Sequence, residues 1–406
     1  MALGAMTDPD KPYTRRSFSQ RFLGGRDWLA DRFKAAGLSV RIDAAGNLIG
    51  RREGARPDAG TIMVGSHSDT VPGGGRFDGI AGVVAALEIA RSLRDGDIQL
   101  QHALEVVDFL AEEPSEFGLS CIGSRGMTGA LDTAALALCD PTGERLDHAI
   151  DRIGGSVEKL DQAKRDDLRC FFELHIEQGR VLEAGNIDIG LVTAIVGILR
   201  VEIEFRGSAD HAGTTPMTMR HDALAAAADL IVSLGAAARE LAASGQGYFV
   251  ATTGVLTVEP NAANVVPARA RMIIEARSEI PALLDGFRAT IEATSAAMAQ
   301  RHDVERTRCA VLSSTRPAAC SPMLRGLLGA GAKAHGLSSI DLASGAGHDA
   351  AFISRIAPAA MVFIPCRDGK SHAPEEWAEP QALAAGTAVM YDAILRFDRM
   401  HKNGAA

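Results

Sequence analysis

Imidazole and carboxylate side chains follow several predicted strands of this 406-residue chain, near the points where those strands run into loops. They are His67, Asp78, the pair Glu112 and Glu113, His175 and His372. In an α/β protein the strand ends meet at the edge of the sheet, and distant segments build a polar site there. The pattern therefore predicts an α/β fold with one polar site, and its residue types are typical of a two-metal hydrolase centre.

The first segment begins with the short apolar run 61–64, which is typical of a buried strand and leads to His67. Asp78 follows three successive glycines and stands just before an Ala-rich stretch, 80–93, that is expected to be a helix. Taken alone, an aspartate at a helix start is more often an N-cap residue than a metal ligand. We expect Asp69 to fix the orientation of the His67 ring through its second nitrogen.

The second segment is the predicted strand 104–110, followed by Glu112, Glu113 and Pro114. Adjacent side chains on a strand point to opposite faces, so both carboxylates reach one site only if the backbone turns. Pro114 favours such a turn. One carboxylate would then bind metal while the other moves a proton. A solvated acidic loop is the alternative reading of a Glu-Glu pair.

Two further predicted strands, 170–174 and 361–364, lead to His175 and His372. A single histidine is more often a structural residue than a ligand. Repetition of the same pattern at four strand ends is what favours a shared site.

Six segments, in this order, resemble the N-carbamoyl-L-amino acid hydrolase and allantoate amidohydrolase branch of the aminoacylase/carboxypeptidase metallopeptidase superfamily. The likeness runs from about Arg26 to about Leu395. The segments are GSHSDT (65–70), FDG (77–79), EE (112–113), LHIEQG (174–179), DHAGTTPM (210–217) and SGAGHDA (344–350).

The resemblance implies two divalent metal ions per subunit. Asp78 is implied to bridge them, with His67 and His175 completing one site and Glu113 and His372 the other. Zn²⁺ suits imidazole and carboxylate ligands and is our first expectation, with Mn²⁺, Co²⁺ or Ni²⁺ as alternatives.

The resemblance also implies three catalytic residues. Glu112 would act as the general base towards a metal-activated water and pass the proton to the leaving nitrogen, and Asp69 would support the metal site. His211 is implied to reach the active site of a partner subunit and stabilise the oxyanion, which implies a homodimer. Without the resemblance, His211 would read as a loop histidine near the helix expected over 221–241.

The implied substrate is a small molecule with a free carboxylate. Arg277 suits this role because a guanidinium binds a carboxylate through two parallel hydrogen bonds, although a surface arginine at a strand end is the alternative. Asn264 is implied to assist, and both residues, like His211, are expected to be supplied across subunits. The implied substrate-binding residues of the catalytic domain are Gln178, Gly345, Ala346 and Gly347.

One segment departs from the family pattern. Pro114, Ser115 and Glu116 stand where Gly, a variable residue and Arg are typical. An acid thus replaces an arginine, so we expect the charge at the pocket rim to change and the substrate to differ from a plain N-carbamoyl amino acid.

The sequence therefore predicts a binuclear metal-dependent amidohydrolase that cleaves a C–N bond of a small N-carbamoyl- or N-acyl-L-amino acid. An allantoate or other ureido-compound amidohydrolase, or an aminoacylase, is the alternative within enzymes. A catalytically silent relative that binds a small ligand is the alternative from another class.

Residues 1–195 and 303–406 are predicted to form a discontinuous catalytic domain with a mixed sheet flanked by helices, because His372 must return to the metals. Residues 196–302 are predicted to form a smaller α+β lid and dimerisation domain inserted in it. Residues 1–14 are expected to be disordered.

Composition excludes several other classes. The formal charge of −9 without a Lys/Arg run argues against nucleic-acid or anionic-membrane binding. No apolar run approaches the length of a membrane span. The six cysteines lack metal-finger spacing, and we expect reduced thiols and a cytoplasmic location.

Overall fold

The computed structural model describes residues 1–402, which divide into two compact units. Unit 1 comprises Met1–Thr193 and the described residues from Ala319 onward, and unit 2 comprises Ala194–Ala318. The sequence placed the inserted domain at 196–302. Unit 2 extends further because strand β10 (Glu305–Ser314) pairs with β7 (Gly197–Arg206).

Unit 1 is built on a nine-stranded mixed sheet with the order β1-β2-β4-β3-β5-β13-β6-β11, in which β12 pairs with β6. The four central strands β4, β3, β5 and β13 are parallel, so their carboxyl ends open on one edge. The strands are β1 (Ser39–Ile42), β2 (Leu48–Arg52), β3 (Thr61–His67), β4 (Ala103–Phe109), β5 (Leu168–Ile176), β6 (Ile189–Ile195), β11 (Ala318–Ala319), β12 (Ser339–Ser344) and β13 (Ala359–Ile364).

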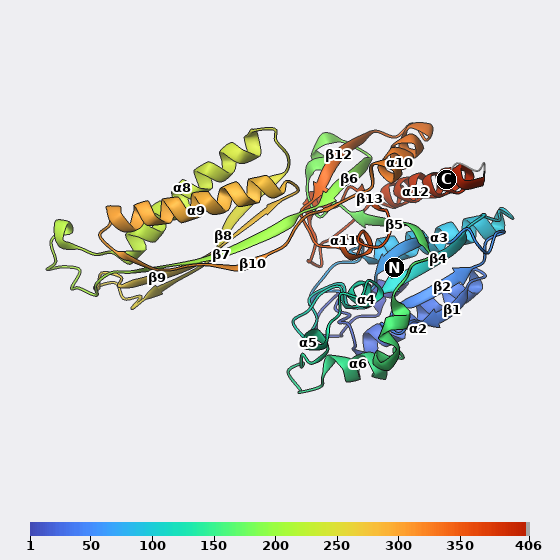
Figure 1. Ribbon diagram of the computed structural model, residues 1–406, viewed down its shortest axis with the longest axis horizontal. Helices are drawn as coiled ribbons and strands as arrows, with labels where there is room; N and C mark the ends of the chain where they lie inside the picture. Colours follow the sequence, from blue (N-terminus) through green and yellow to red (C-terminus); the bar gives the residue numbers. More distant parts are fainter. Residues whose placement is uncertain (403–406) are drawn as a thin grey trace. The chain divides into compact units, whose positions relative to one another are not determined.

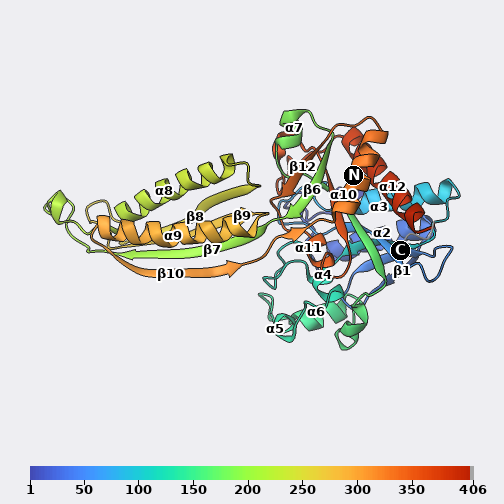
Figure 2. The ribbon, with the colours of Figure 1, turned by 45° about the horizontal axis from the view of Figure 1, so that its top comes forward.

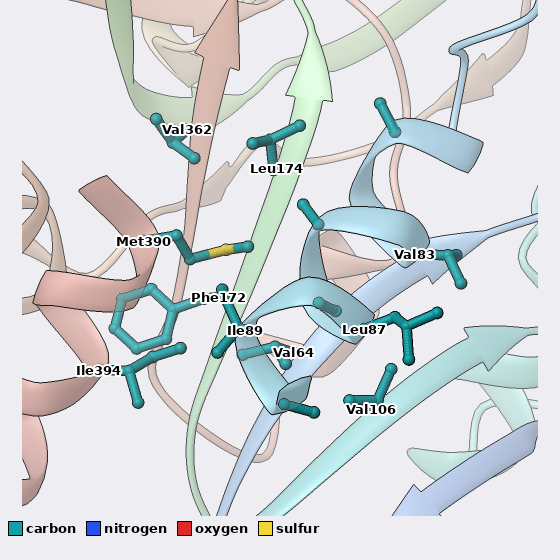
Figure 3. Packing of buried hydrophobic residues seen from close by; sticks show 14 of the residues in the cluster. Val64, Val83, Leu87, Ile89, Val106, Phe172, Leu174, Val362, Met390 and Ile394 are labelled. Carbon is teal, nitrogen blue, oxygen red and sulfur yellow. The ribbon is translucent and has the colours of Figure 1, made fainter. Parts of the chain in front are cut away.

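The central strands are buried along almost their whole length, as expected for parallel strands covered on both faces. Their apolar side chains form a core with helices α2 (Gln20–Ala35), α3 (Ile80–Asp95), α10 (Pro322–Ala334) and α12 (Pro380–Lys402). Figure 3 shows Val83 and Ile89 of α3 and Met390 and Ile394 of α12 in this cluster, with Phe172 of β5.

Short helices complete unit 1, and several of them flank the loops that leave the sheet. A second core cluster joins Phe22, Leu110 and Ile150. The short elements are α1 (Ala2–Ala5), α4 (Ile122–Met127), α5 (Thr133–Leu136), α6 (Leu146–Arg152), η1 (Val157–Ala163), α7 (Val181–Gly185), α11 (Ala350–Ile353) and η3 (Arg367–Gly369).

Unit 2 is a four-stranded antiparallel sheet with the order β10-β7-β9-β8, covered on one face by α8 (Ala223–Ala243) and α9 (Pro281–Arg301), as Figures 1 and 2 show. Its other elements are β8 (Phe249–Glu259), β9 (Arg269–Ser278) and η2 (Met217–Met219). Burial alternates along β9, with Met272 and Ile274 in the core under the helices and, apart from Ile273, charged residues on the other face. Cross-strand ion pairs such as Glu202 with Arg271 and Glu204 with Arg269 cover that face.

The predicted fold class is confirmed: a mixed sheet flanked by helices, and a second unit with its own antiparallel sheet. In residues 1–402, no helix combines the length and apolar character needed to cross a bilayer.

The prediction of disorder for residues 1–14 was wrong. After helix α1, the N–H of Thr14 donates to Oγ1 of Thr7, and the N–H of Asp8 donates to the carbonyl of Thr14. Leu3 and Thr14 are buried. The segment is ordered because Leu3 is buried and polar groups of Tyr13 and Thr14 find partners in the loop after β3, which local composition cannot show.

Candidate metal centre and active site

The carboxyl edge of the parallel strands gathers the predicted ligands. His67 is the last residue of β3 and His175 the penultimate residue of β5, while Glu113 follows β4. Asp78 lies before α3 and His372 follows β13. These residues come together because the central strands are parallel and end side by side.

Two groups of side chains could each hold a cation, and Asp78 belongs to both. Ligand atoms of His67, Asp78 and His175 all lie within 4.8 Å of one another, and so do those of Asp78, Glu113 and His372. Oδ1 of Asp78 lies 3.1 Å from Nε2 of His175 and 3.7 Å from Nε2 of His67. Oδ2 lies 3.0 Å from Nε2 of His372, so the two oxygens face different imidazoles.

The orientation of two imidazole rings suits metal binding. Nδ1 of His67 lies 3.1 Å from the carbonyl oxygen of Asp69, and Nδ1 of His175 lies 2.9 Å from that of Ile176. A carbonyl only accepts, so each Nδ1 carries the proton. The Nε2 lone pairs then face the cluster, as in protein metal sites. Imidazole and carboxylate donors at this spacing fit a pair of divalent ions such as Zn²⁺.

Packing around this cluster leaves no room for larger side chains at two glycines. A Cβ on Gly79, whose φ is +65°, would lie 2.4 Å from the His67 ring. A Cβ on Gly75 would lie 1.9 Å from the carboxylate of Glu376. Both positions therefore need glycine for the loop to approach these side chains.

Glu112 belongs to neither ligand group. Its Oε2 lies 3.6 Å from Nε2 of His67, and the residue is 8% exposed. Burial, together with the nearby charge of Glu113, raises the pKa of Glu112 well above its usual value. A carboxylate with a raised pKa next to a metal site is suited to accept and return a proton.

The turn that aligns Glu112 and Glu113 begins earlier than expected. Ala111 adopts a left-handed conformation with φ of +51°, three residues before Pro114. The carboxylate of Asp69 then receives the backbone N–H groups of both glutamates at 3.3 Å. Asp69 thus anchors this turn, and its backbone carbonyl rather than its carboxylate makes the closer contact with His67.

Asp78 is supported by residues that the sequence analysis did not assign. Oε1 of Glu376 accepts the backbone N–H groups of Phe77 and Asp78 at 2.7 and 3.1 Å. The hydroxyl of Ser371 lies 3.0 Å from Oδ2 of Asp78 and 2.9 Å from Oε2 of Glu376. Ser371 directly precedes His372 and Glu376 lies four residues after it, and this closeness in sequence was the only signal for them.

The change of charge at the pocket rim stays a prediction, but Glu116 is not an isolated acid. Glu116 is paired with Arg16, whose Nε lies 3.0 Å from its Oε1. The acid that replaces the family arginine is therefore balanced by an arginine from a remote segment. Pairing across 100 positions leaves no local pattern, so the sequence could not show it.

Of the predicted substrate-binding groups in unit 1, Gln178 lies beside the candidate ligand Asp78. Its Nε2 donates to Oδ2 of Asp78 at 3.0 Å, and its buried Oε1 has no hydrogen-bond partner among the described residues. Space beside Gly347 is open. The N–H of Ala346 donates to Oγ of Ser344 at 3.2 Å, so that donor is engaged within its own turn. Gly345 also has a partner.

The remaining predicted residues lie in unit 2. His211 and Asn264 are exposed and lie on two loops that pair with each other. His211 and Val265 form an isolated antiparallel β-bridge, and the N–H of Ala212 donates to the carbonyl of Asn264 at 2.9 Å. Arg277 lies near the far end of β9, where its Nε and Nη2 both contact Oε1 of Glu275 at 2.7 Å.

Comparisons with known proteins agree with this geometry. The family described as "Peptidase family M20/M25/M40" matches residues 63–396 of this chain. An N-carbamoyl-L-amino acid amidohydrolase of Geobacillus stearothermophilus is 37% identical over 397 residues, covering 97% of this chain and 96% of that protein. A ureidoglycolate hydrolase of Oryza sativa subsp. japonica is 34% identical over 401 residues, covering 97% and 82%.

A solved structure is similar over the same extent. An amidase of the hydantoinase/carbamoylase family from Burkholderia multivorans superposes with a TM-score of 0.90 at 34% identity, covering 97% of this chain and 96% of that one.

Proposed function

Because this chain belongs to peptidase family M20/M25/M40, we propose that it is a metal-dependent amidohydrolase that cleaves a C–N bond of a small N-carbamoyl- or N-acyl-L-amino acid. The family resemblance that the motifs predicted is confirmed. The observation that carries the proposal is the pair of ligand groups that share Asp78 at the sheet edge.

We assign two divalent ions to this edge, with Zn²⁺ as the first choice. His67 and His175 would hold one ion, Glu113 and His372 the other, and Asp78 both. Ions bound there would polarise the scissile carbonyl and lower the pKa of the attacking water.

The residues of the chain then divide the remaining work. Glu112 lies beside the ligands without being one, and is placed to take a proton from the attacking water and return it to the leaving nitrogen. Asp69 keeps Glu112 and Glu113 aligned through their backbone N–H groups. The unpartnered Oε1 of Gln178 is suited to accept an N–H group of the substrate.

Arg277 is our candidate for binding the substrate carboxylate. Its Nε and Nη2 already contact the carboxylate of Glu275, so a substrate that binds through these two donors would exchange one carboxylate for another. Glu275 would keep a cation during this exchange, because its Oε2 also pairs with Nε of Arg200 at 2.6 Å.

The geometry of unit 2 favours a site shared between subunits of a homodimer. His211 and Asn264 lie on loops near Arg269, at the start of β9, whereas Arg277 lies near its end. Eight steps of about 3.3 Å separate Arg269 from Arg277, or about 26 Å. One small substrate cannot span that distance, so if all three residues contact it, two copies of the chain must contribute.

The relatives leave the exact substrate open, since one is named for N-carbamoyl-L-amino acids and another for ureidoglycolate, which also carries a carbamoyl group. We place the N-carbamoyl-L-amino acid first, on the higher identity. A panel of N-carbamoyl, N-acetyl and N-aroyl amino acids, with allantoate and ureidoglycolate, tests this in metal-loaded protein with and without chelator.

We expect the metal-loaded protein to hydrolyse at least one compound of the panel. This activity should be lost with chelator and restored when metal is added back. Release of ammonia with a free amino acid identifies the carbamoyl reaction, and release of a carboxylic acid identifies an aminoacylase. If no compound is hydrolysed by protein that retains its metals, the alternative of a silent ligand-binding relative replaces the enzyme proposal.

A cytoplasmic location fits the same proposal. All six cysteines are free in the structure, as expected in a reducing compartment.

A further inference from the structure

The loops that carry the candidate site are long and contain little regular structure. Residues 68–79, which include Asp78, form no strand or helix and contain three successive glycines. Such a loop loses much backbone entropy when it is ordered, so it needs partners that hold it.

The N-terminal segment Tyr13–Arg16 supplies many of these partners. Thr70 exchanges two hydrogen bonds with Arg15, since its N–H donates to the Arg15 carbonyl at 3.1 Å and its Oγ1 accepts the Arg15 N–H at 2.8 Å. The N–H of Gly73 donates to Oγ1 of Thr14 at 2.7 Å, and the guanidinium of Arg76 stacks on Tyr13, 4.7 Å from its ring centre.

Arg16 extends this contact to the second loop, which carries Glu112 and Glu113. Its Nη1 donates to the carbonyl of Thr70 at 3.2 Å, while Nη2 donates to the carbonyl of Pro114 at 2.5 Å. Its Nε pairs with Glu116 at 3.0 Å. One guanidinium therefore joins the loop after β3 to the loop after β4.

The fork of an arginine is suited to this task because its donors diverge in one plane. The Arg16 side chain is only 16% exposed, whereas Glu116 is 52% exposed. Exposed ion pairs contribute little, so the two carbonyl contacts are expected to matter more than the pairing with Glu116.

We propose that Arg16 is a positioning residue that fixes the Glu112–Glu113 loop against the loop 68–79, which follows His67 and bears Asp78. It touches neither the ligands nor the reacting atoms, and acts through the backbones of Thr70 and Pro114. The kinetic part of this inference rests on the proposed function, but the structural part does not.

Hydrogen exchange of the metal-free protein tests the structural part. In Arg16→Met, amides in both 68–73 and 112–119 should exchange faster than in the wild type. Arg325→Ala is the matched control, because Arg325 forms a pair of similar exposure with Asp341 on α10 and β12. Unchanged exchange, or a rise in only one segment, would overturn the joining role.

Steady-state kinetics with the substrate found in the panel tests the positioning role. Arg16→Met should lower kcat about 10- to 100-fold, as changes behind metal ligands and catalytic groups do, with KM within about twofold and full metal content. Arg16→Lys keeps the charge but not the planar fork of donors, so its kcat should lie between those of the wild type and Arg16→Met. Arg325→Ala removes an ion pair of similar exposure on α10 and β12, and its kcat should stay within about threefold of the wild type.

Wild-type kcat in Arg16→Lys together with wild-type kcat in Arg16→Met would refute the proposal. If Arg16→Met does not fold, Arg16→Lys decides: a kcat and an exchange pattern equal to the wild type count against it. A wild type that hydrolyses nothing in the panel refutes the proposed function instead, and the exchange result still decides whether Arg16 joins the loops.

Discussion

The carboxylate of Glu376 accepts a hydrogen bond from the backbone N–H of Asp78 at 3.1 Å, across 298 positions of the chain. The same oxygen accepts the N–H of Phe77, and Glu376 is 1% exposed. This contact holds the end of the glycine-rich loop so that the Asp78 side chain faces His175 and His372.

Glu376→Ala should therefore weaken metal binding about 10- to 100-fold, the usual effect of losing a partner behind a ligand. Glu376→Gln should lose less, because its amide oxygen can still accept both backbone N–H groups. Competition with a chelator measures the affinity, and the exposed neighbour Glu375→Gln serves as control. If Glu376→Ala binds metal as tightly as the wild type, the glycine-rich loop keeps its conformation without Glu376.

The sequence predicted where the strands end but not what supports the site. Apolar runs such as 61–64 have a composition and a length that indicate buried strands, and the polar residues after them could be seen directly. The contact between Glu376 and Asp78 depends on the return of the chain after β13, and no local period encodes such a pairing.

The sequence pattern also could not predict the backbone conformation of these segments. Pro114 indicated a turn, but the chain turns at Ala111, a residue that seldom adopts positive φ. The N-terminal segment was expected to be disordered because chain ends often are, yet Thr14 and Arg15 are buried and bond to the loop after β3. Polar burial of this kind depends on partners that composition does not reveal.

Glu112→Gln should keep its metals and lose turnover. Glu112 lies outside both ligand groups, so metal content should equal that of the wild type, while kcat should fall about 10²- to 10⁴-fold with the loss of the base. Metal analysis and steady-state kinetics check both parts, with exposed Glu88→Gln on α3 as control. A kcat within tenfold of the wild type would remove Glu112 from this role.

Asp398 should give the protein a pH-dependent share of its stability. Burial opposes its charge, but the His102 side chain, 2.7 Å away, and the N–H groups of Gln101 and His102 outweigh it and lower the pKa of Asp398 below its ordinary 3.8. Because the folded pKa is the lower one, this stabilisation is present above about pH 4 and is lost as the pH falls through the folded value.

Asp398→Asn should thus lower the free energy of unfolding by about 1–3 kcal/mol at pH 7, and the gap to the wild type should narrow below pH 4. Urea unfolding of the metal-free proteins at pH 7 and pH 3.5 measures it without interference from metal release. An equal gap at both pH values would mean that packing, not charge, accounts for the difference.

Metal stoichiometry should separate the shared ligand from the unshared ones. His372 faces only the Asp78 and Glu113 group, so His372→Ala should retain about one ion per chain, whereas Asp78→Asn should weaken both sites. Bound metal also stabilises the fold by mass action, by about 2.7 kcal/mol at 100 times the Kd. Tm should therefore fall in the order wild type, His372→Ala, Asp78→Asn when metal is in excess, and all three should converge after demetallation. Because a bridging carboxylate contacts both ions, a variant Asp78→Asn that still binds one ion as tightly as the wild type would mean that each ion has its own separate ligands.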